Sequence, residues 1–169
     1  NAFFMIKDYL SASPDLITTE HLVALDPEEA LTEAQKVALS SAGNKGWYLT
    51  FGSGNHDAEQ VVTSSVVVGR MAYFSTHAPK TPSDDEIKVC GANLGTARGY
   101  AVNFLDGAGF DNGERYNVFK GGGLPPSPVS GVVTLALTDV DGSPLLDADG
   151  KPITASVPIS FFKGRMPSF

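Results

Sequence analysis

A close alternation of strand-like runs and glycine-centred turns is the feature that most constrains the fold of this chain. The stretch from Gly46 to Pro79 reads GWYLTFGSGNHDAEQVVTSSVVVGRMAYFSTHAP. It predicts three strands, at 46–51, 61–68 and 71–78. Each run is short and rich in β-branched and aromatic residues, as strands are. A two-residue loop with glycine first, Gly69-Arg70, separates the last two runs and predicts a hairpin with a type II′ turn.

The same signals predict strands elsewhere in the chain. The apolar burst Phe3 to Ile6 indicates a buried strand, and Gly99 to Leu105 indicates another. Near the end, VVTLALTDVDGSPLLDADGKPITASVPISFF predicts strand, turn, short strand, turn and strand, because Asp-Gly pairs favour tight hairpins. The stretch GGGLPPSPVSG between these regions is expected to be a rigid connector.

One segment predicts a helix, at about residues 27–41. Asp26 stands at the N-cap position, Pro27 at the first helical position, and Glu29 can reach back to the Asp26 amide. Gly43 is free to adopt positive φ and is expected to end the helix. Apolar residues recur at helical spacing, at Leu31, Ala34, Val37 and Ala38.

Charge and hydropathy exclude several classes of protein. The 169 residues carry a formal net charge of −7, and the 12 basic residues are scattered, which argues against binding to nucleic acid or anionic lipid. We expect these basic side chains, Arg98 and Arg115 included, to be solvated. No apolar run approaches the ~20 residues that a membrane span requires. The chain starts at Asn1 without a signal-peptide pattern, so we expect that Asn1 is not the translation start.

No residue in the sequence is predicted to be catalytic, to bind a cofactor or to bind a metal. Four aspartates, Asp139, Asp141, Asp147 and Asp149, cluster near the C-terminus. An EF-hand loop counted from Asp139 would require Gly at the sixth position and an acid at the twelfth, where Pro144 and Gly150 stand. Hairpin-turn chemistry therefore explains these aspartates better than calcium does.

Histidines, the single cysteine and the aromatic residues also have ordinary structural interpretations. The three histidines, His21, His56 and His77, stand alone and are expected to be packed or surface imidazoles. Cys90 is either a buried thiol or the partner of a cysteine elsewhere in a longer protein. Aromatic residues within predicted strands are expected to be core, with a sugar-stacking surface as the alternative. They are Trp47, Tyr48, Tyr73, Phe74, Tyr100 and Phe104.

Three stretches together resemble the last blades of the C-terminal β-propeller region of the PilY family, proteins of type IV pilus biogenesis and tip adhesion. The first is NAFFMIKD, and the second is KGWYLTFGSGNHDAEQVVTSSVVVGRMAYFSTHAP. The third is CGANLGTARGYAVNFLDGAGF leading into GGGLPPSPVSGVVTL. The resemblance covers most of residues 1–140. It implies an extracellular, cell-surface module that is exported across the inner membrane and has no enzyme activity. The calcium loop of the family lies upstream of the matched region, so no metal ligand is transferred to this chain.

The predicted fold class is all-β: a partial, antiparallel β-propeller with one inserted α-helix. We expect residues 1–169 to form a single β-rich domain. At about 40–50 residues per blade, the chain supplies two to three blades, fewer than the four or more that close a propeller. The chain is therefore expected to be a fragment that works with the remainder of the same protein or with a neighbouring subunit, including pilins or minor pilins. Asn1 to Ile6 is the segment most expected to lie open or to pair with another chain.

Two alternatives to a non-catalytic structural or binding module remain. One is a fragment of a quinone-dependent propeller dehydrogenase, which would require a calcium site and a Trp that stacks on the cofactor. The other is a sugar-binding surface module.

Overall fold

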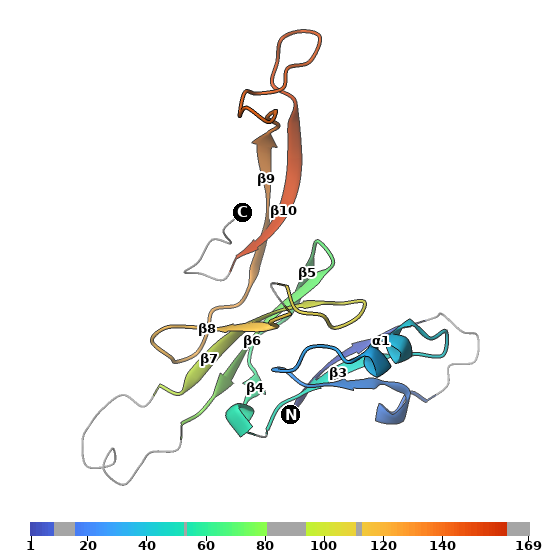
Figure 1. Ribbon diagram of the computed structural model, residues 1–169. Helices are drawn as coiled ribbons and strands as arrows, with labels where there is room; N and C mark the ends of the chain where they lie inside the picture. Colours follow the sequence, from blue (N-terminus) through green and yellow to red (C-terminus); the bar gives the residue numbers. More distant parts are fainter. Residues whose placement is uncertain (9–15, 53, 81–93, 111–112, 162–169) are drawn as a thin grey trace.

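A computed structural model describes residues 1–8, 16–52, 54–80, 94–110 and 113–161 (Figure 1). Within these ranges the fold is mostly β with one α-helix, which confirms the predicted β-rich class. The strands are β1 (Ala2–Ile6), β2 (Val23–Leu25), β3 (Gly46–Thr50), β4 (Gln60–Val61), β5 (Val66–Val68), β6 (Met71–Ala78), β7 (Thr96–Asn103), β8 (Tyr116–Val118), β9 (Val129–Ala136) and β10 (Thr154–Phe161). The helix is α1 (Glu33–Ser40), and two short 3-10 turns are η1 (Thr19–His21) and η2 (Gly54–His56).

The strands form three sheets. A mixed sheet has the order β1-β3-β2, with β1 antiparallel and β2 parallel to β3. A five-stranded antiparallel sheet has the order β4-β6-β7-β8, and β5 pairs with β6 beside β4. The strands β9 and β10 pair only with each other, within the part of the chain that the structure describes.

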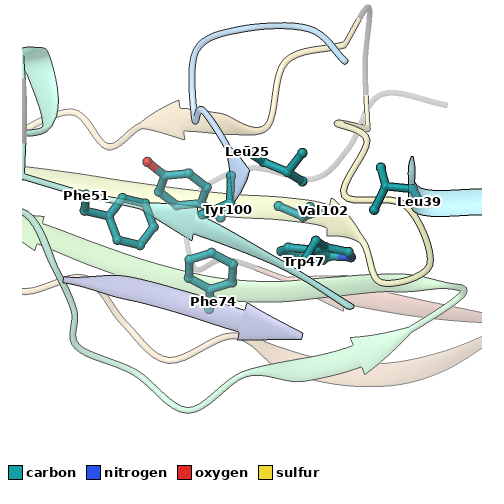
Figure 2. Packing of buried hydrophobic residues seen from close by; sticks show 8 residues of the cluster. Leu25, Leu39, Trp47, Phe51, Phe74, Tyr100 and Val102 are labelled. Atoms are coloured by element: carbon teal, nitrogen blue, oxygen red, sulfur yellow. The ribbon is translucent and has the colours of Figure 1, made fainter. Parts of the chain in front are cut away.

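The core lies where the mixed sheet packs on the five-stranded sheet (Figure 2). Three rings form a continuous stack from one sheet to the other: Phe3 on Phe74 with centroids 4.0 Å apart, and Phe74 on Tyr100 with centroids 4.8 Å apart. Trp47 is fully buried beside them, and its indole N–H donates to the carbonyl of Phe104 at 3.0 Å. Large apolar surfaces are thus removed from water while the one polar indole atom keeps a partner.

The predicted hairpin at Gly69-Arg70 is present, but its turn type differs from the prediction. Val68 pairs with Met71 in an antiparallel register, so the loop has the two predicted residues. Gly69 has φ +56° and Arg70 has φ +71°. Positive φ at both central residues defines a type I′ turn, whereas type II′ requires it only at the first. The prediction was wrong because Arg70, a residue that seldom adopts positive φ, does so here.

Two strand predictions were wrong in extent. The run 61–68 forms two short strands, β4 and β5, instead of one, and both pair with β6. The predicted buried strand at Phe3 to Ile6 is β1, and it is only partly buried: Phe3 and Met5 pack against the core on one face, whereas Phe4 on the other face is 48% exposed. Among the described residues β1 pairs only with β3 and forms one edge of the mixed sheet; that Asn1 to Ile6 lies open or pairs with another chain stays a prediction.

The helix begins six residues later than predicted and is capped by other residues. Thr32 is the N-cap, and its side chain accepts a hydrogen bond from the Gln35 amide in a capping box. The side chain of Asp26 instead accepts from the amide of Glu28 in a local turn. A tertiary contact favours this turn, because Arg115 donates to the carbonyls of Asp26 and Glu29 and so occupies acceptors that a helix would use.

The C-terminal end of the helix also differs from the prediction. The C-cap is Ser41, in an extended conformation, and its amide donates to the carbonyl of Ala38. Gly43 follows two residues later and is not among the residues with positive φ. The helix therefore ends without the left-handed glycine that the sequence predicted.

The hairpin β9–β10 projects away from the two packed sheets (Figure 1). We call residues 129–161 the arm. The strand β5 contacts the base of the arm. The arm leaves large aliphatic side chains exposed, with Val132 69% and Leu135 45% accessible. The three sheets do not form a detectable propeller within the described residues, so the structure supports the β-rich class but not the finer assignment to propeller blades.

Candidate functional site

The four clustered aspartates build two equivalent turns at the end of the arm. In the first, Asp139 and Ser143 pair through their backbone, and the Asp139 carboxylate accepts from the amides of Asp141 and Ser143. Gly142 has φ +82°, which completes a three-residue hairpin loop with a left-handed glycine. The second turn repeats this arrangement from Asp147 to Lys151, with Gly150 at φ +76°.

These turns give a structural role to one aspartate of each pair. The carboxylates of Asp139 and Asp147 hold the turns, and all four aspartates are exposed. The underlying repeat is visible in the sequence as DVDGSPLL followed by DADGKPIT, an eight-residue period that the sequence-based predictions missed. Among the described residues, no group of three or more His, Cys, Asp or Glu side chains is placed to bind a metal ion.

A buried polar cluster lies beside the aromatic core and is the main feature that sequence reasoning missed. Its centre is Glu59, which is fully buried at the end of the turn that follows η2. We define the polar cluster as Glu59, His56, Thr76, Arg98 and Tyr100. Thr76 is in register with Arg98 across β6 and β7, and Tyr100 lies two residues further along the same face of β7. The five-stranded sheet thus presents these groups to one carboxylate.

The Glu59 carboxylate is surrounded by hydrogen-bond donors. The guanidinium of Arg98 donates to Glu59 Oε2 at 2.8 Å, and the hydroxyl of Tyr100 donates to Oε1 at 3.0 Å. Thr76 Oγ1 also donates to Oε1, and Nδ1 of His56 pairs with Oε2. A buried carboxylate is stable only when it is paired and hydrogen-bonded, and Glu59 has both kinds of partner.

The environment of the cluster also changes the acidity of Tyr100. Burial, and then the neighbouring Glu59 carboxylate, raises the pKa of the Tyr100 phenol well above its usual range. The phenol therefore remains neutral and keeps its proton for the hydrogen bond to Glu59. Glu59 and Tyr100 are inaccessible to solvent, so the evident role of the cluster is to fasten the turn at 54–59 to the five-stranded sheet.

Two arginines that we expected to be solvated are buried. Arg98 is 6% exposed in the polar cluster, and Arg115 is 2% exposed. Arg115 donates to the carbonyls of Gly107, Asp26 and Glu29, and burial lowers its pKa. Composition alone could not identify them, because their acceptors lie on distant segments. The available signal for its inward position was the two-residue spacing that places Arg98 on the same face of β7 as Tyr100 and Val102, which are both buried.

The aromatic and histidine predictions have mixed outcomes. Three of the six aromatic residues, Trp47, Phe74 and Tyr100, are fully buried, and the other three are partly buried. His56 is packed as expected, and His21 is exposed. Cys90 lies outside the described residues.

These positions bear on the two alternative functions. The ring of Trp47 is enclosed by protein, so it offers no face to a quinone. Phe4 and Tyr48 stack with centroids 5.5 Å apart, and Phe4 is about half exposed, so the sugar-binding alternative keeps one aromatic surface.

Two surfaces of the described chain are poorly covered: the outer edge of β1 and the arm. The stem of the arm, formed by β9 and β10, contains no charged residue. Its register places alternate residues in two rows of cross-strand pairs. One row contains Val129, Gly131, Val133 and Leu135 opposite Phe161, Ile159, Val157 and Ala155, and the other contains Ser130, Val132, Thr134 and Ala136 opposite Ser160, Pro158, Ser156 and Thr154. The first row is apolar throughout, and the second is rich in Ser and Thr.

Searches of protein-family models, of curated proteins and of solved structures find no match to this chain. No helix within the described ranges is long and apolar enough to cross a bilayer.

Proposed function

We propose that this chain is a non-catalytic structural and binding module of a type IV pilus-associated cell-surface protein. The observation that carries the proposal is the uncovered arm, a two-stranded hairpin with an uncharged stem and exposed aliphatic side chains. Such a hairpin is only marginally stable by itself in water, and exposed apolar surface of this kind marks an interaction site. The resemblance to the PilY family suggests the setting, an exported protein that acts in pilus biogenesis and adhesion.

We further propose that the five-stranded sheet is one blade of an incomplete propeller. Its four positions, β4/β5, β6, β7 and β8, follow one another along the chain and pair with antiparallel neighbours, which is the topology of a propeller blade. The open edge of β1 and the apolar row of the arm are then the places where other strands complete the assembly. Those strands belong to the remainder of the same protein or to a neighbouring subunit, with pilins and minor pilins as candidate partners.

The location of the protein and its effect on pili test this proposal. In the source cells, an antibody against the chain should detect it in the fraction of surface pili that mechanical shearing releases. Deletion of the gene should reduce the number of surface pili or their adhesion. A protein confined to the cytoplasm of cells whose pili are unaffected by the deletion would contradict the proposed function.

A matched pair of variants tests the role of the arm in the same cells. Leu135→Asp places a charge in the apolar row, whereas Thr134→Asp places one in the row rich in Ser and Thr. We expect Leu135→Asp to lose the pilus-associated fraction and Thr134→Asp to retain it, because burying an unpaired charge at an interface is costly. Equal behaviour of the two variants would show that the apolar row is not the contact surface.

A further inference from the structure

Glu28 occupies a partly open site at the border of the polar cluster. It belongs to the segment that joins β2 to α1, and its Oε1 atom accepts a hydrogen bond from the hydroxyl of Tyr116 at 3.1 Å. The same oxygen lies 3.3 Å from Nε2 of His56. The Glu28 side chain is 41% exposed, whereas the side chain of His56 is only 6% exposed. The carboxylate thus closes the solvent side of a site whose inner wall is buried.

The second nitrogen of His56 indicates that this occupant fits imperfectly. Nδ1 pairs with Glu59, but Nε2 is buried and makes no hydrogen bond. Nε2 is close enough to the Glu28 carboxylate for an ion pair, but the two groups are not oriented for a hydrogen bond. Buried polar atoms without a hydrogen bond are rare and call for an explanation such as an absent water or ligand. A carboxylate can accept from the Tyr116 hydroxyl, and it can accept from Nε2 when that nitrogen also carries a proton.

The charges around the site also suit a carboxylate. The Arg98 guanidinium lies 5.4 Å from the centre of the Tyr116 ring, and the ring of His56 meets that of Tyr116 edge to face at 5.3 Å. Glu59 is the opposing negative charge, and it is already hydrogen-bonded to Arg98. A carboxylate at the mouth therefore lies beside the hydroxyl donor of Tyr116, whose ring faces the Arg98 guanidinium.

The backbone of this segment is anchored, so only the Glu28 side chain has to move to free the site. Arg115 donates to the carbonyl of Asp26 at 2.9 Å and to the carbonyl of Glu29, and the amide of Glu28 donates to the Asp26 side chain at 2.8 Å. A long, part-exposed glutamate side chain can rotate into solvent without disturbing these contacts.

We propose that Tyr116 Oη and His56 Nε2 form a carboxyl-binding site, and that Glu28 is its built-in occupant. A carboxylate from outside the chain, either a free small acid or an acidic side chain of a partner polypeptide, takes the place of Glu28 when that side chain swings out. The inference rests on the geometry around Glu28 and is independent of the proposed pilus function.

The test empties the site and offers it a carboxylate. In Glu28→Ala, acetate added at constant ionic strength should raise the thermal unfolding midpoint and shift the His56 ring resonances in a saturable way, whereas chloride should not. Glu29→Ala, which removes the neighbouring exposed carboxylate, is the matched control and should not respond to acetate. Adding Tyr116→Phe to Glu28→Ala should weaken acetate binding about tenfold, the loss expected for one hydrogen bond to a charged group.

Two further arms identify the source of the carboxylate and protect against a variant that does not fold. A short Gly/Ser peptide with one glutamate should bind Glu28→Ala more tightly than acetate if the natural ligand is a polypeptide, and no more tightly if it is a small acid. Glu28→Gln keeps the volume of the side chain and should show the same His56 shift at higher acetate concentration. If the His56 resonances of both folded variants do not move with acetate, the site does not bind carboxylates and the proposal is wrong.

Discussion

Removal of the Glu59 carboxylate should be among the most damaging single changes to this fold. Glu59 and Arg98 approach to 2.8 Å, and both are almost completely buried. At an effective dielectric constant of about 20, two unit charges at this distance attract by about 6 kcal/mol before desolvation is counted. Glu59→Ala removes one partner and leaves the Arg98 charge buried, which typically costs about 3–5 kcal/mol of unfolding free energy.

Urea unfolding of the folded variants measures this loss, and a second substitution tests its cause. Glu59→Leu combined with Arg98→Met removes both charges, so it should destabilise the protein by less than the sum of the two single changes. Asp57→Ala, at an exposed carboxylate two residues away, should change the unfolding free energy by less than about 0.5 kcal/mol. The reasoning is refuted if Glu59→Ala costs less than about 1 kcal/mol, or if the losses at positions 59 and 98 are simply additive.

Three further predictions concern backbone strain and pH. Arg70→Gly should stabilise the protein by about 1 kcal/mol, because Arg70 has φ +71° in the type I′ turn; a lower thermal midpoint would contradict this assignment of the turn. Gly46→Ala should destabilise the protein strongly, because a Cβ atom there would overlap the Met5 carbonyl and because Gly46 has φ +137°. Gly43→Ala is the control and should be tolerated, since a Cβ atom at Gly43 would meet open space. Equal thermal midpoints for the two variants would show that β1 and β3 do not approach this closely. The folded state keeps Tyr100 neutral, whereas the unfolded chain ionises it near pH 10. This group should therefore leave the unfolding free energy unchanged below about pH 10 and lower it above that pH by up to about 1.4 kcal/mol per pH unit. Urea unfolding between pH 9 and 11 should show a shallower loss of stability for Tyr100→Phe than for the unsubstituted protein, and equal slopes would rule out this cause.

Local sequence determined the positions of most β elements. The strands at Gly46–Thr50 and Met71–Ala78 and the hairpin between β5 and β6 follow from alternation, residue type and short turns. These features depend on residues close together in the chain, where steric limits on φ and ψ and the two-residue period of a strand act directly. The two aspartate turns belong to the same class, because each is held by residues within four positions of one another.

Tertiary structure decided the features that depend on distant partners. The helix starts at Glu33 because Arg115, 89 residues after Asp26, binds carbonyls in the segment before it. Glu59 lies between the predicted strands 46–51 and 61–68, yet it is buried because Arg98, 39 residues away, and Thr76 supply its partners. A single sequence does not show which charges will meet, since burial of a charge is favourable only when the fold brings its counterpart within hydrogen-bond distance.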